Sequence, residues 1–178
     1  MIYSDNSLRE LLRQGYLPKG VHIGPSSVDL TLSNSFCCLD VQPDEEVDVR
    51  VEQNFYEWNA NSISINPGEF LLASTSEEIG VPIDCAAYVE GRSSVGRIGI
   101  QVQNAGFIDA GFRGQITLEI QNQSKFTVVL HSGMRICQLV YCQMTTPCSH
   151  PYDGKYQFQK GATHSRIYQD VEFYKNYL

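Results

Sequence analysis

The chain has 178 residues, of which 42% are hydrophobic and 19% are charged, and its formal net charge is -7. This length suits one domain that buries its own core, while the acidic balance argues against a surface that coats nucleic acid. No apolar run approaches the length of a membrane span, and the first residues lack the layout of a signal peptide, so we expect a cytoplasmic protein without membrane partners.

A short helix is expected near the N-terminus, over residues 7–14. Ser7 and Glu10 have the spacing of a capping box, the leucines between 8 and 12 form one apolar stripe, and Gly15 is a natural helix end. The helix would therefore pack one face against the rest of the domain.

Short β-strands are expected over most of the remaining chain. In residues 28–32, Val28, Leu30 and Leu32 alternate with polar residues, which predicts a strand with one wet face. Similar runs follow, separated by Pro and Gly turns, as is typical of a sandwich, barrel or jelly roll. We find no repeat and no linker, so residues 1–178 are expected to form one domain. The acidic stretch 43–62 is expected to be a surface excursion.

The six cysteines do not indicate a metal or disulfide framework. None has C-x-x-C spacing, and no histidine lies in a ligand-like repeat with them. Two of them, Cys137 and Cys142, fall in apolar strand-like text. Reduced thiols are therefore favoured over zinc ligands.

The last thirty residues are polar and rich in tyrosine. Two interpretations stay open for residues 150–178, a mobile tail or a tail that orders over a ligand. Lys155, Gln159 and Arg166 carry donors suited to an anion, which favours the second.

Three segments in the middle of the chain could build one site. The strand expected at 115–122 is apolar at its even positions, so its odd positions, Glu119 among them, point the other way. Residues 92–97, RSSVGR, crowd two arginines and two serines around a glycine turn, and such groups bind phosphate oxygens. Residues 104–114 form a glycine-rich turn around Asp109 that could approach a ligand closely. Together they suggest a nucleotide site.

Five blocks in this order resemble the dCTP deaminases of the dUTPase superfamily. They are IGPSSVDLTLSNSF, RSSVGRIG, AGFIDAGFRGQITLEIQN, GMRICQL and YDGKYQFQKGATHSR, and they leave residues 36–66 as the main part not covered. The resemblance implies a mainly β, dUTPase-like distorted jelly roll (β-clip) with a short N-terminal helix. It also implies a homotrimer with active sites at subunit interfaces, and a hydrolase that deaminates cytosine without a catalytic metal. The H-x-E and P-C-x-x-C signatures of zinc deaminases are absent from the sequence.

The resemblance also implies a role for each site residue. Glu119 would shuttle protons, first as general base and then as general acid. The Ser93 hydroxyl and the Ala105 carbonyl would orient the attacking water, while Arg97 would stabilise its developing negative charge. Asp109 would bind the 3′-hydroxyl of the deoxyribose. The other nucleotide-binding residues would be Arg92, Ser94, Val95, Gly96, Thr117, Leu118, Tyr152, Lys155 and Gln159, with the tail 150–178 closing over the site.

Magnesium is expected to arrive on the phosphates of dCTP, because the chain shows no metal cage of its own. dUTP is a candidate second substrate, and dTTP is a candidate inhibitor, as is common in the family. Asp29 is interpreted as a structural residue.

A pure dUTPase is disfavoured, because such enzymes have an apolar residue where this chain has Glu119, and their glycine-rich C-terminal motif is missing. The turn Ala105-Gly106-Phe107 resembles that of bifunctional members, which convert dCTP to dUMP, ammonia and pyrophosphate. The alternatives are a monofunctional deaminase that releases dUTP, and a trimeric nucleotide-binding protein without turnover. Two positions depart from the family pattern, Asn104, where Thr is usual, and Phe158, where Gly is frequent.

Overall fold

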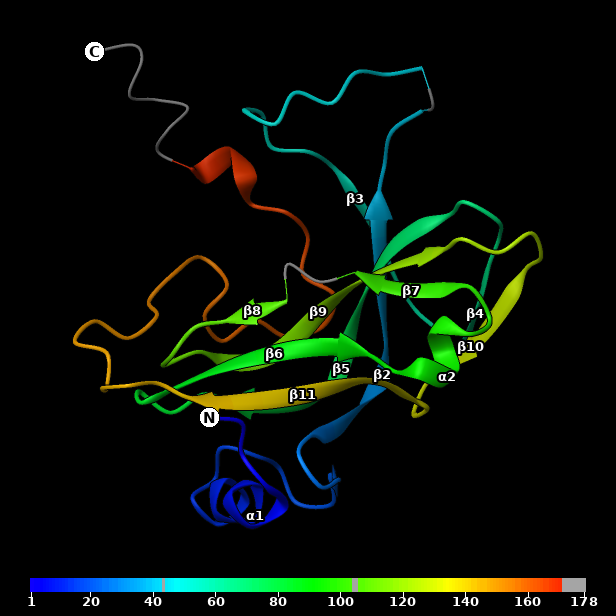
Figure 1. Cartoon of the computed structure of the whole chain (residues 1–178). Helices are drawn as coiled ribbons and strands as arrows, with labels where there is room; N and C mark the ends of the chain where they lie inside the picture. The colour runs from blue at the N-terminus through cyan, green and yellow to red at the C-terminus, as the bar shows by residue number, and fades with distance from the viewer. Residues whose placement is uncertain (43, 104–105, 171–178) are drawn as a thin grey trace, which may run out of the picture.

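The computed structural model describes residues 1–42, 44–103 and 106–170 (Figure 1). Its helices are α1 (Asp5–Arg13), α2 (Ser93–Gly96) and the 3-10 helix η1 (Ile167–Gln169). Its strands are β1 (His22–Ile23), β2 (Val28–Leu39), β3 (Phe55–Asn59), β4 (Ser62–Ile65), β5 (Phe70–Gly80), β6 (Cys85–Gly91), β7 (Ile100–Gln103), β8 (Phe107–Ile108), β9 (Arg113–Asn122), β10 (Val128–His131) and β11 (Arg135–Gln143).

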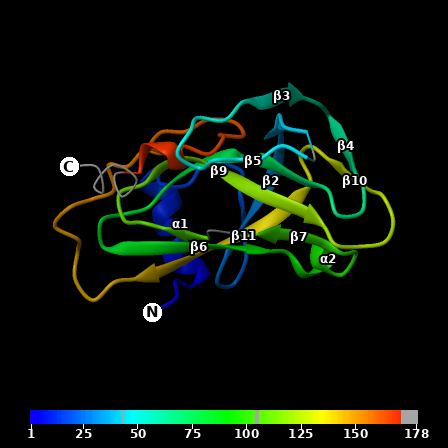
Figure 2. The ribbon, with the colours of Figure 1, turned by 90° about the horizontal axis from the view of Figure 1, so that it is seen from above.

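Within the described residues, nine strands form one curled antiparallel sheet, which confirms the prediction of a mainly β domain. Its path is β7-β9-β5-β2-β11-β6-β8, with β1 and β3 also paired to β2, and β4 with β10 forms a separate pair. The long strand β2 runs upright through the sheet in Figure 1 and is seen nearly end-on from above in Figure 2. The central path therefore places β9, the strand that carries Glu119, between β5 and β7.

Helix α1 begins earlier than the sequence predicted. Ser4 is the N-cap residue and makes no side-chain cap bond, so the predicted capping box between Ser7 and Glu10 is wrong. The Glu10 carboxylate instead accepts from Arg13 and Gln14 in the last turn. Gly15 does end the helix, with φ of 79°, a conformation that costs glycine little.

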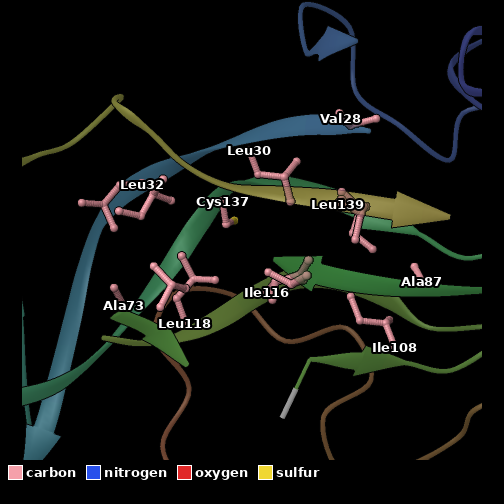
Figure 3. Packing of buried hydrophobic residues seen from close by; sticks show 14 of the residues in the cluster. Val28, Leu30, Leu32, Ala73, Ala87, Ile108, Ile116, Leu118, Cys137 and Leu139 are labelled. Atoms are coloured by element: carbon pink, nitrogen blue, oxygen red, sulfur yellow. The ribbon is translucent and has the colours of Figure 1, made fainter. Parts of the chain in front are cut away.

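The core lies between the layers of the curled sheet (Figure 3). Apolar side chains from β2, β5, β9 and β11 converge there, and Leu30, Leu118 and Leu139 are fully buried. All six cysteines are free thiols. This packing buries the apolar face of β9. The opposite face of the strand is half-buried and can line a binding site.

One part of β2 differs from the predicted wet face. Asp29 is buried, with 6% of its side chain exposed, because β2 is central and Asp29 meets cations from neighbouring elements. Its carboxylate lies 2.8 Å from Arg135 Nη1 and 3.5 Å from Arg92 Nε. A buried charge needs such partners.

Candidate active site

Strand β9 alternates as the sequence predicted. Its even positions, among them Ile116, Leu118 and Ile120, are buried, and its odd positions are half-buried on the other face. Leu118 is one of the predicted nucleotide-binding residues, and its side chain is in the core. It can therefore meet a ligand only through its backbone, whereas Thr117 and Glu119 present their side chains to the other face.

That other face of β9 forms one wall of a cavity of about 710 Å³. Five predicted site residues line this cavity together, although they come from distant parts of the chain, and they are Asp109, Thr117, Glu119, Tyr152 and Gln159. Much of the remaining lining is apolar, contributed by residues such as Phe70, Leu72, Phe107 and Phe112. The combination of an apolar cavity with a few convergent polar groups is typical of a small-molecule site.

Glu119 is the carboxyl in this cavity whose burial changes its acidity. Its strand neighbours are Leu72 on β5 and Gln103 on β7. Burial raises the pKa of the Glu119 carboxyl above its ordinary value, because desolvation penalises the charged form. A carboxyl of this kind can take up a proton and return it, as acid–base catalysis requires.

Asp109 is exposed and begins the turn that leads from β8 into β9. The turn is fastened at its base to Val81, whose carbonyl accepts from Gly111 N at 2.9 Å and whose amide donates to Phe112 O at 2.9 Å. Gly111 has φ of 90°, and a Cβ at this position would lie 2.5 Å from Pro151 Cβ. Glycine is therefore required here both for its backbone conformation and for the close approach of the tail.

The tail, residues 150–170, runs along the turn and the half-buried face of β9. Gln159 exchanges backbone and side-chain bonds with Gln115, since its carbonyl accepts from Gln115 N and its Nε2 donates to Gln115 O at 2.8 Å. Thr163 N donates to Thr117 Oγ1 at 3.1 Å. The tail is therefore held on β9 by hydrogen bonds, and several of its residues line the cavity.

Lys155 faces a partner inside the tail itself. Its ammonium forms an ion pair with Asp170 and donates to Arg166 O at 3.1 Å. Lys155 is not among the residues that line the cavity. Its predicted contact with phosphate would require the side chain to leave Asp170.

The segment RSSVGR lies at a different hollow, of about 310 Å³. The predicted residues Arg92, Ser93, Val95 and Gly96 line it, together with residues of β7, and α2 begins after Arg92. Ser94 and Arg97 are exposed, whereas Val95 is buried in the core. Within the part of the chain that the structure describes, the two hollows share no lining residue.

The predicted site residues thus fall into two groups, which we call the Glu119 half and the Arg97 half. The Glu119 half comprises Asp109, Thr117, Glu119, Tyr152 and Gln159, which line the larger cavity. The Arg97 half comprises residues 92–97, of which Arg92, Ser93, Val95 and Gly96 line the smaller hollow. Ala105, the predicted water ligand, and the unusual Asn104 lie outside the described residues. Phe158 has φ of 61°, a left-handed conformation that glycine adopts more readily than phenylalanine, which agrees with the expectation of glycine at this position.

The sequence analysis missed one wall of the cavity. Residues 44–54 are mostly exposed, as expected of a surface excursion, whereas 55–59 form β3 on β2. Val47, Val49 and Val51 line the Glu119 cavity. Tyr168 of the tail donates to Glu52 at 2.7 Å, which joins this segment to the tail beside it in both ribbon views (Figures 1 and 2). The alternation of valines with charged residues was the available signal.

The described residues 1–42, 44–103 and 106–170 contain no group of three or more His, Cys, Asp or Glu side chains placed to hold a metal ion. Over the same residues, each helix is too short or too polar to cross a bilayer.

Comparison with known proteins adds a family to this geometry. Residues 2–144 match the model of the family described as dCTP deaminase-like. A protein of Persephonella marina named "dCTP deaminase, dUMP-forming" is 42% identical over 180 residues, covering 97% of this chain and all of that protein. A protein of the same name from Aquifex aeolicus is 43% identical, with 97% and 98% of the two chains covered. A Haloarcula marismortui protein named "dCTP deaminase" is 39% identical over 97% of this chain and 98% of its own.

Solved structures show the same fold. The 2'-deoxycytidine 5'-triphosphate deaminase of Agrobacterium tumefaciens superposes with a TM-score of 0.63 at 23% identity, over 79% of this chain and 48% of that chain. The dUTPase of Staphylococcus bacteriophage 80alpha reaches 0.50 at 16% identity, over 78% and 88% of the two chains. The predicted dUTPase-like fold is confirmed by these likenesses.

Proposed function

The chain belongs to the dCTP deaminase family, and from this premise we propose that it converts dCTP and two waters into dUMP, ammonia and pyrophosphate. The observation that carries the proposal is the pairing in one cavity of Glu119, a desolvated carboxyl, with Asp109 on the adjacent turn. Deamination at C4 of cytosine needs one group that moves protons, and hydrolysis of the triphosphate needs a second oriented water.

Glu119 takes the proton of the attacking water and later delivers a proton to the departing ammonia. Its raised pKa suits the second step, because a more weakly acidic carboxyl holds the proton until the leaving group needs it. Once the nucleotide fills the cavity, the apolar lining would exclude competing water and strengthen the electrostatic interactions inside. Asp109 binds the 3′-hydroxyl and orients the water that attacks the α-phosphate, for which the small Gly106 leaves room.

The Arg97 half completes the site from a neighbouring subunit of a homotrimer. Ser93 and Arg97 are exposed beside a hollow that is separate from the Glu119 cavity, so each chain offers them outward. There, Ser93 and the Ala105 carbonyl would orient the deaminating water, and Arg97 would stabilise its negative charge. This arrangement would give three equivalent sites by symmetry.

The triphosphate is bound by Arg92 and Ser94 from one side and by the tail from the other. Guanidinium groups and hydroxyls suit phosphate oxygens, and Arg92 is already oriented by its ion pair with Asp29. Magnesium, brought by the nucleotide, would be held through the phosphates and would neutralise part of their charge. A further use of dUTP as substrate, inhibition by dTTP and a cytoplasmic location stay predictions.

The first test is to incubate the full chain with dCTP and magnesium and to resolve the nucleotides over time. We expect dUMP and equimolar pyrophosphate without accumulation of free dUTP. Accumulation of dUTP would make the enzyme a monofunctional deaminase, and the absence of ammonia would contradict the assignment altogether.

The shared site can be tested by mixing subunits. Glu119→Gln and Arg97→Ala are each expected to be inactive, but equal mixing after reversible dissociation should restore about a quarter of the sites if each site uses two subunits. Two Glu119→Gln preparations mixed together are the control. No recovery in a mixture whose hybrid trimers are shown by mass spectrometry would place both residues in one subunit.

A further inference from the structure

One tail residue to which the sequence analysis gave no role bridges the Asp109 turn. The half-buried side chain of Gln157 donates from Nε2 to Gly111 O at 2.9 Å and to Tyr152 O at 3.0 Å. Its Oε1 accepts from Arg113 N at 2.8 Å. Both donors and the acceptor of this one amide are thus used, and only this orientation of the amide satisfies all three partners.

These bonds add to contacts that already join the turn and the tail, in which Tyr152 N donates to Ala110 O at 2.8 Å and the rings of Phe112 and Tyr152 meet edge to face. Gly111 and Arg113 lie in the turn that follows Asp109, and Tyr152 lies in the tail and lines the cavity. The turn is held at its base by Val81, and its tail-facing side is held by Gln157. Phe158 extends this side with a backbone bond from its amide to Arg113 O at 2.8 Å.

We propose that Gln157 is a positioning residue that locks the tail to the Asp109 turn, so that Asp109 and Tyr152 meet the nucleotide in one fixed geometry. The proposal rests on the function given above. It assigns to Gln157 an effect on nucleotide binding and on the phosphate step, which Asp109 serves. The proton transfers of Glu119, which is held by β9 between β5 and β7, do not depend on it.

Gln157→Glu tests this most directly, because it keeps the volume and the acceptor but replaces two donors by an oxygen that faces two carbonyl oxygens. Gln157→Ala removes all three bonds without adding charge. Gln143 provides a matched control on β11: its half-buried amide donates twice to Asp84, accepts from Tyr3, and lines neither hollow. Gln143→Ala therefore loses the same number of bonds far from the turn.

We expect both Gln157 variants to raise KM for dCTP and the share of dUTP among the products by about fivefold or more, with kcat for ammonia release within about threefold of wild type. Without nucleotide, amide hydrogen exchange should quicken in residues 109–115 and 151–160 together. Gln143→Ala should lower Tm by a similar amount and leave KM and products unchanged.

An unchanged KM and product ratio in Gln157→Ala, despite faster exchange, would overturn the proposal, as would the same changes in Gln143→Ala. Failure of the proposed function is visible separately, because wild type alone would then release dUTP or no ammonia. If wild type releases dUTP, the split between KM and kcat still decides the role of Gln157. If no ammonia is released, the affinity of the Gln157 variants for dCTP, compared with that of wild type, decides whether Gln157 has this role.

Discussion

The Glu119 half and the Arg97 half of the site differ in how one chain surrounds them. Glu119 and Asp109 line a cavity whose walls are β9, the Asp109 turn, the tail and the valines of the acidic segment. Ser93 and Arg97 lie exposed around a four-residue helix, next to a smaller hollow. The first half is surrounded by segments of its own chain, whereas in the proposed homotrimer a partner subunit would surround the second. Substitutions in the two halves should therefore differ in their effects on activity and on thermal stability.

The largest effect is expected from Glu119→Gln, which removes the proton-transferring carboxyl from the Glu119 half. Deamination should fall by about 10³-fold or more while dCTP still binds, since the side chains are nearly isosteric. Ammonia release measures the deamination rate, and equilibrium binding measures the affinity for dCTP. Retained ammonia release would remove Glu119 from its role.

The pH dependence of wild type sharpens this prediction. Because burial raises the pKa of Glu119, the ionised base should be lost, and kcat/KM should fall, at a higher pH than for an ordinary carboxyl. The folded state favours the neutral form, so ionised Glu119 costs stability above its folded pKa. Glu119→Gln should therefore raise Tm at neutral pH, and the gain should vanish in acid, below the ordinary carboxyl pKa.

Arg97→Ala changes the Arg97 half and should reduce kcat by about 10²-fold, because the developing negative charge loses its stabilisation. Its Tm should stay at the wild-type value, because the side chain is exposed in the single chain. Calorimetry and steady-state kinetics separate the two effects. A large loss of Tm would indicate that Arg97 holds the assembly together instead.

The contact between turn and tail can be broken with Gly111→Ala, using Gly20→Ala as control. Both glycines have φ of 90°, but a Cβ at Gly20 meets nothing within 4 Å, whereas at Gly111 it meets Pro151. Both variants should lose about 1–2 kcal/mol to backbone strain. Gly111→Ala should lose about 1–3 kcal/mol more through overpacking, measured by urea unfolding. Equal losses of unfolding free energy in the two variants would show that the tail moves away from residue 111 at little cost.

The smallest effect is expected at the anchor of the Arg97 half. Asp29→Asn keeps the volume but removes the buried charge shared by Arg92 and Arg135, and should cost about 1–2 kcal/mol, discounted because Arg135 is half-exposed. KM for dCTP should rise as Arg92 loses its orientation. Asp48→Asn removes an exposed ion pair with Arg50, and it should change neither the free energy of unfolding nor KM for dCTP. An unchanged KM in Asp29→Asn would leave Asp29 with a structural role alone.

The sequence by itself determined the mainly β fold and the buried and half-buried faces of β9, because these follow from alternation, whereas the roles of the site residues stay predictions. It placed the start of α1 incorrectly and expected a wet face at Asp29, since capping and burial depend on neighbours that are distant in sequence. The tertiary structure alone decided that Val47, Val49 and Val51 wall the cavity, that Asp170 holds Lys155, and that Gln157 ties the tail to the Asp109 turn. Each of these contacts joins segments whose meeting depends on how the curled sheet and the tail pack, and no local pattern encodes that.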